Sequence, residues 1–113
     1  MKTPTLLAAA FSLTGVVSFA AGDAPFAVNQ YWAKTCAACH GVNGKADTKA
    51  GKKIGAINFT DPKNQEKFTD AQMFKTIKEG VKDKDGMFTM KPAEHVTDEQ
   101  IKLLIAHIRA FKQ

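Results

Sequence analysis

The pattern of apolar and polar residues predicts its clearest helix at the end of the chain, over Thr97–Phe111. From Ile101 to Phe111, apolar residues recur at i, i+3, i+4, i+7 and i+10, which is the spacing of one helix face. Thr97 and Gln100 have the spacing of a capping box, in which each side chain hydrogen-bonds the other residue's backbone N–H. This segment should therefore form an amphipathic helix with one face in the core.

Two more segments have helical spacing. Thr69–Glu79 carries an apolar stripe and the same capping-box pair of Thr and Gln, and Gly80 is suited to end the helix. A further helix is predicted over Asp23–Thr35, starting near Asp23 or Pro25.

The stretches between these helices lack a regular period. Residues 41–68 are polar and punctuated by glycines, and Thr60-Asp61-Pro62 in this stretch is typical of a turn or a helix start. Residues 82–96 form a second irregular stretch, and no strand-like alternation of useful length occurs anywhere. We therefore expect an all-α domain with three main helices and two long loops, and loops this long usually have a function.

The N-terminal residues are typical of a targeting segment. The chain has 113 residues, enough for one domain at most. An uncharged apolar run, Leu6–Val17, precedes the small residues Ser18 and Ala20, as in a secretory signal. The run is shorter than the ~20 apolar residues that span a bilayer. We expect residues 1–20 to be a cleaved signal and 21–113 to be an exported, periplasmic domain, with an uncleaved anchor as the alternative.

The charge pattern favours a protein partner. The formal net charge is +5, and acidic residues are mixed among the lysines of the middle of the chain. No basic patch is interleaved with aromatic residues, so nucleic acid is an unexpected ligand. A weakly basic face could steer the domain towards an acidic protein. A merely solvated surface is the alternative for any single lysine.

The sequence Cys36-Ala37-Ala38-Cys39-His40 carries the most specific chemistry. C-x-x-C-H is the signature of covalent c-type haem attachment. On a helix, Cys36 and Cys39 lie on one face with His40 beside them, so two thioethers and one axial imidazole can hold the same group. A disulfide is the alternative, but it would close a very short loop and add little stability.

The other face of the iron would need a second ligand. Met90 ranks first because it lies in an irregular segment stiffened by Pro92. Met87 is the runner-up, followed by His95 in the same loop. His107 ranks last, because a packed histidine on the apolar side of the final helix explains it as well. A thioether favours ferrous iron, so His/Met ligation raises the reduction potential relative to His/His.

On these pieces the chain resembles the class I c-type cytochromes, small exported bacterial monohaem proteins. The likeness is carried by the haem motif with Gly41, by Asn43-Gly44-Lys45, by Met90-Lys91-Pro92 and by the closing helix. The resemblance implies one haem c with its iron, bound through Cys36 and Cys39 and ligated by His40 and Met90. It also implies a monomeric electron carrier with redox-protein partners and no catalytic activity.

Two positions depart from the family pattern, and a proline that the family often has is missing. Val28 stands where the family commonly has a glycine, and His107 stands where it commonly has an aromatic residue. We expect a wider helix crossing around Trp32, Leu104 and His107. No proline lies between His40 and Asp61, so the imidazole should hydrogen-bond another group, with a backbone carbonyl near residues 54–55 as the candidate.

Two other classes of function stay open. A haem protein with an open or labile sixth site would bind ligands or act as a small redox-enzyme subunit, with Glu94 and His95 as distal groups. A module without haem is the third possibility. Its zinc version would need two histidines besides the cysteines, at a spacing that fits no common finger. Its thioredoxin-like version lacks a βαβ context.

Overall fold

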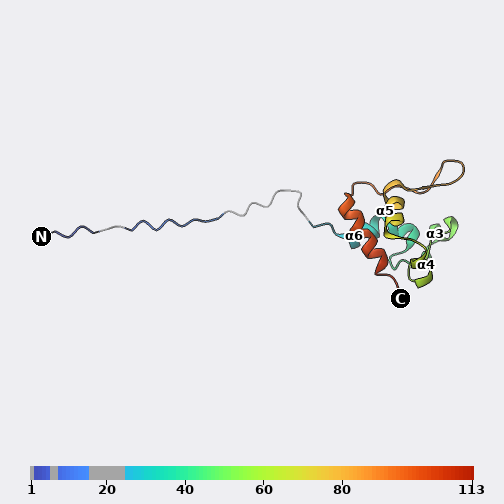
Figure 1. The fold of residues 1–113 in the computed structure, drawn as a ribbon, viewed down its shortest axis with the longest axis horizontal. Helices are drawn as coiled ribbons and strands as arrows, with labels where there is room; N and C mark the ends of the chain where they lie inside the picture. Colours follow the sequence, from blue (N-terminus) through green and yellow to red (C-terminus); the bar gives the residue numbers. More distant parts are fainter. Residues whose placement is uncertain (1, 6–7, 16–24) are drawn as a thin grey trace.

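The computed structural model describes residues 2–5, 8–15 and 25–113 (Figure 1). Residues 2–5 and 8–15 contain no helix or strand, and the predicted signal cleavage position lies outside the described residues. No described helix has both the length and the apolar character needed to cross a membrane. The remaining elements are α1 (Val28–Tyr31), η1 (Trp32–Cys36), α2 (Ala37–His40), α3 (Lys49–Ile54), α4 (Pro62–Glu66), α5 (Asp70–Glu79), β1 (Val81–Lys82), β2 (Phe88–Met90) and α6 (Asp98–Arg109).

The first helical segment runs without a break from α1 through η1 to α2. It begins at Val28, later than predicted, and continues past Thr35 to include the whole C-x-x-C-H motif. The middle part, η1, is a π-helical turn that the apolar spacing did not predict. Such turns are rare and often occur at functional sites. Here the π turn ends at Cys36, at the start of the motif.

The stretch over residues 41–68, predicted to be irregular, contains two short helices. At α3 the Thr48 side chain accepts a hydrogen bond from the Gly51 N–H, and Gly55 ends the helix in the left-handed conformation. At α4 the Asp61 side chain accepts one from the Lys63 N–H, and Pro62 occupies the first turn. Of the two possibilities predicted for Thr60-Asp61-Pro62, a turn or a helix start, the structure has the helix start. Helix α3 was not predicted, because it is short and polar.

Both predicted capping boxes are present. Thr69 and Gln72 form one at the start of α5, and Thr97 and Gln100 form the other at the start of α6. Helix α5 ends at Glu79, as expected, and α6 ends at Arg109, two residues before the predicted end. These caps depend on residues three apart, so the sequence alone predicts them.

The second irregular stretch contains a small antiparallel hairpin, which corrects the prediction that the chain has no strands. Val81 pairs with Met90 and Lys82 pairs with Phe88, so a bulge falls at Thr89. The Asp83 side chain accepts hydrogen bonds from the Asp85 and Met87 N–H groups and closes the turn. Figure 1 shows this hairpin projecting from the body of the domain. The described fold is therefore mostly helical with a two-stranded sheet.

The hydrophobic core lies where α6 meets the first helical segment and α5. Ile101 and Leu104 are its most deeply buried side chains. Trp32 and His107 meet where the two helical segments cross, with ring centroids 5.2 Å apart. The greater width expected for this crossing stays a prediction. The other buried residues of this core cluster are Ala37, Phe59, Met73, Ile77, Ile105 and Ile108.

Candidate functional site

The two cysteines lie where a helical C-x-x-C-H motif should place them. Cys36 ends the π turn, and Cys39 lies one helical turn later in α2. Both side chains are half-buried, and they are not joined in a disulfide. Burial raises the pKa of the Cys36 thiol to about 11, so this thiol stays protonated at neutral pH. Two thiols three residues apart on a helix can reach the same edge of one ligand.

The C-terminal end of the motif helix is held by hydrogen bonds from elsewhere in the chain. The Thr48 hydroxyl donates to the Cys39 carbonyl at 3.0 Å, and the Ala46 N–H donates to the His40 carbonyl at 2.9 Å. The buried Trp32 indole N–H donates to the Gly41 carbonyl at 2.9 Å. Carbonyls at a helix end lack partners within the helix, so these hydrogen bonds fix the direction in which the chain leaves α2.

Gly51 allows α3 to pack directly on the motif. A Cβ atom at Gly51 would collide with the backbone carbonyl oxygen of Cys39 and lie 2.9 Å from that of Ala46. Only a residue without a side chain fits this approach. The role of Gly51 was not predicted, because the local pattern offers only its position three residues after the capping Thr48.

His40 lies in an apolar, aromatic environment. Its ring stacks on Phe59 at a centroid distance of 5.0 Å and lies 5.8 Å from that of Trp32. Burial lowers the pKa of His40, which favours the neutral imidazole that binds metals. Its Nδ1 atom is buried and has no hydrogen-bond partner among the described residues. The expected bond to a carbonyl near residues 54–55 is therefore absent.

Met90 and Met87 differ sharply in their surroundings. Met90, at the end of β2, is half-buried and packs against the core. Met87 lies in the hairpin turn and is 67% exposed. The backbone of Met90 lies close to Gly80, whose φ is +75°: a Cβ there would come within 2.5 Å of the Met90 carbonyl oxygen and 2.8 Å of Pro92. Only one of the two methionines is thus fixed against the domain.

The bulge at Thr89 decides which way Met90 points. In a regular strand, Phe88 and Met90 would lie on the same face. Residues that pair across two strands share a face of the sheet. Val81 and Lys82 are neighbours in β1 and lie on opposite faces. Their partners Met90 and Phe88 therefore also lie on opposite faces, because of the bulge. Phe88 is 45% exposed, with the Lys82 ammonium 4.9 Å from its ring centroid. Met90 is the half-buried residue of β2.

The other two histidines, His95 and His107, were also candidates for the second iron ligand. His95 is exposed, with a φ of +60° in the loop before α6. His107 packs edge-on against Phe111 at 4.8 Å and against Trp32, with its Nε2 atom buried and without a partner. No group of three His, Cys, Asp or Glu side chains among the described residues converges on a possible metal position.

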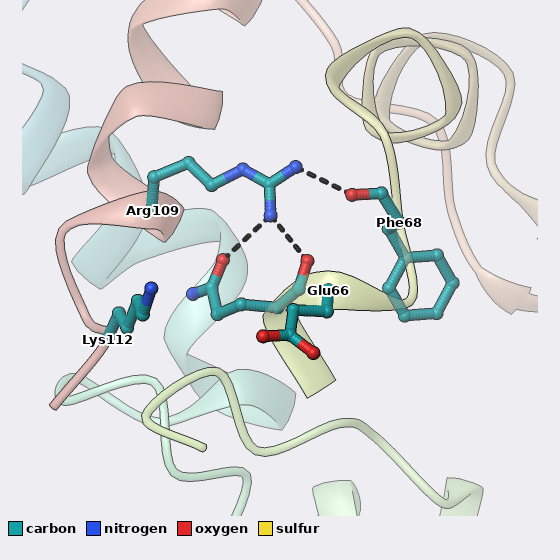
Figure 2. A pocket seen from close by; sticks show the side chains of 5 residues that line it. Glu66, Phe68, Arg109 and Lys112 are labelled. Atoms are coloured by element: carbon teal, nitrogen blue, oxygen red, sulfur yellow. Dashed lines mark hydrogen bonds between the residues drawn. The ribbon is translucent and has the colours of Figure 1, made fainter. Parts of the chain in front are cut away.

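A pocket between α4 and α6 contains the cation Arg109 (Figure 2). Its guanidinium donates to the backbone carbonyls of Gln65 and Phe68, each at 2.6 Å, and to the carboxylate of Asp70 at 3.0 Å. The Gln65 side chain accepts a further bond from Arg109 and donates to the Phe59 and Ile108 carbonyls. With its donors used in this way, Arg109 ties α4 and α5 to α6 and has a structural role.

Comparisons with known proteins identify a family and similar solved structures. Residues 24–108 match the family "Cytochrome C oxidase, cbb3-type, subunit III". The solved structure of KustC0563, a c-type cytochrome, is 32% identical in sequence. The match covers 75% of this chain and 96% of that one, with a TM-score of 0.64. A tyrosine-to-phenylalanine variant of that protein matches with a TM-score of 0.62, 32% identity and coverages of 75% and 98%. No curated protein is significantly similar in sequence.

Proposed function

Since the chain belongs to the family of cbb3-type cytochrome c oxidase subunit III domains and is a small monohaem cytochrome c, we propose that it shuttles single electrons between redox proteins. Membership of this family implies a covalently bound haem c with its iron, and haem-based electron transfer as the general activity. The carrier role, the individual binding residues and the cellular compartment form the proposal. We expect an exported, periplasmic monomer without catalytic activity of its own.

Cys36 and Cys39 are the proposed thioether attachment points. They are unpaired thiols, one helical turn apart, on a helix whose end is held by Thr48 and Ala46. His40, the next residue, is the proposed iron ligand on one face of the haem. Its buried Nδ1 without a partner and its lowered pKa are consistent with a neutral imidazole whose environment suits a bound metal.

Met90 is the proposed iron ligand on the haem face opposite His40. The contrast between Met90 and Met87 is the main support for the role of electron carrier. A methionine packed against the domain can keep the sixth position filled, whereas one that is 67% exposed in a hairpin turn is not held there. Haem supplies the one-electron chemistry. The protein residues exclude water from it and, through a thioether ligand, shift its potential upwards relative to a second histidine.

Spectroscopy of two matched variants tests this assignment. Met90→Ala should abolish the methionine–iron charge-transfer band of the oxidised protein, and Met87→Ala should leave it intact. Loss of the band in Met87→Ala alone would make the assignment wrong. Carbon monoxide should leave the spectrum of the reduced wild-type protein unchanged, because both axial positions are filled. A prompt shift would instead indicate a haem protein with an open or labile sixth site.

A further inference from the structure

The segment that follows Met90 has no regular structure of its own. Residues 91–97 join β2 to α6 and contain neither helix nor strand. Irregular segments open more readily than helices and strands, because fewer contacts hold them. The proposed iron ligand Met90 lies at the start of this segment. The contacts that hold the segment therefore also limit how far Met90 can move from its position.

Two hydrogen bonds tie this segment to other parts of the fold. The Ala93 N–H donates to the Ile77 carbonyl of α5 at 2.9 Å. The Tyr31 hydroxyl, at the end of α1, donates to the Glu94 carbonyl at 2.9 Å. Within the described part of the chain, no other side chain hydrogen-bonds residues 91–96. Tyr31 is thus the one side chain that fixes this backbone by a hydrogen bond.

The carbonyl that Tyr31 holds belongs to the peptide bond between Glu94 and His95. His95 has a φ of +60°, which is uncommon for a residue other than glycine. A backbone in this region persists where the surrounding groups hold it. The Tyr31 hydroxyl contacts the peptide just before this turn. Its hydrogen bond therefore stabilises the path that the chain takes between Met90 and α6.

Tyr31 is itself anchored on the helical segment that contains the haem motif. It is half-buried, packs against the core, and its ring centroid lies 5.4 Å from that of Phe26. The helix continues without a break from Tyr31 to Cys36, five residues later. The hydrogen bond to Glu94 consequently links the element that bears the cysteines and His40 to the segment that follows Met90.

We propose that Tyr31 is a positioning residue, whose hydroxyl keeps Met90 on the iron by holding the Glu94 carbonyl. This inference rests on the proposed function, because it requires Met90 to be the iron ligand. An external ligand can occupy the sixth position only in molecules in which Met90 has moved away. The fraction of such open molecules sets the apparent affinity for that ligand. Loss of the Tyr31 hydrogen bond should raise this fraction.

Titration of the oxidised, haem-loaded protein with imidazole tests the proposal. The variant Tyr31→Phe removes only the hydroxyl and keeps the ring beside Phe26. Its methionine–iron charge-transfer band should be present before imidazole is added, since most molecules stay closed. The band should then disappear at about fivefold lower imidazole concentration than in wild type, as expected for the loss of one hydrogen bond.

Arg109→Lys is the matched control for a general loss of stability. It disturbs the hydrogen bonds to the Gln65 and Phe68 carbonyls, which lie outside the segment after Met90. We expect it to lower the urea midpoint at least as much as Tyr31→Phe does. Its apparent imidazole affinity should nevertheless stay within about twofold of wild type, because sites with no shared partners act independently.

An equal rise of imidazole affinity in both variants would assign the effect to global stability and overturn the role of Tyr31. An unchanged affinity in Tyr31→Phe would overturn it as well. In that case a wild-type protein with an intact charge-transfer band leaves the proposed ligation by Met90 standing. A wild-type protein that lacks the band refutes that ligation and, with it, the role of Tyr31.

Discussion

Replacing Gly51 with alanine should destabilise the protein, although intrinsic helix propensity predicts the opposite. Gly51 lies in the interior of α3 with a right-handed helical backbone. At an exposed position of this kind, alanine is more favourable than glycine by about 1 kcal/mol. Propensity alone therefore predicts that Gly51→Ala stabilises the domain.

Packing should outweigh this gain. The new Cβ would collide with the Cys39 carbonyl oxygen, a backbone atom that cannot rotate away. Moving α3 outwards also lengthens the 3.0 Å bond from Thr48 to the same oxygen. Overpacking costs about 1–3 kcal/mol, and the lost hydrogen bond costs about 1 kcal/mol more. The net expectation is a loss of roughly 1–3 kcal/mol.

Equilibrium urea unfolding of the haem-loaded protein measures this difference, with Ala50→Gly as the matched control. Ala50 is the exposed neighbour of Gly51 in α3, so its replacement should cost only the propensity difference, about 1 kcal/mol. In thermal unfolding, each kcal/mol corresponds to roughly 4–8 °C for a domain of this size. A Gly51→Ala protein as stable as wild type, or more stable, would refute the close contact between α3 and the haem motif.

Three further predictions follow from the site. Gly80→Ala should weaken the methionine–iron charge-transfer band, because its Cβ would push on the Met90 carbonyl at a backbone φ of +75°; an unchanged band would argue against this contact. Burial lowers the pKa of His107, so its imidazole binds a proton more readily in the unfolded chain than in the folded one. The free energy of unfolding should therefore fall as the pH drops from 7 through 6.5 and below. The His107→Phe variant should show a weaker pH dependence in urea titrations at pH 7 and 5. Arg109→Lys should lower the free energy of unfolding by about 1–3 kcal/mol in the same titrations, since an ammonium cannot reproduce the forked hydrogen bonds to the Gln65 and Phe68 carbonyls. A loss below about 0.5 kcal/mol, the usual limit for surface changes, would contradict the structural role.

The parts of the fold that were predicted correctly depend on neighbours in the sequence. The capping boxes at Thr69 and Thr97 and the apolar stripe of α6 use residues three or four apart. The C-x-x-C-H motif is local in the same sense, because five consecutive residues specify its chemistry. Errors appeared where the local signal was short or absent, as in the polar helix α3, the π turn and the bulged hairpin.

The haem motif was evident from the amino-acid sequence, because adjacent residues carry it and their helical spacing brings the cysteines and His40 together. The choice of Met90 over Met87 as a ligand was a ranking in the sequence and stays a proposal. The structure shows how differently the two lie: Met90 packs on the core and Gly80 fits against its backbone, whereas Met87 is exposed. These contacts join segments far apart along the chain, so only the tertiary structure could decide them.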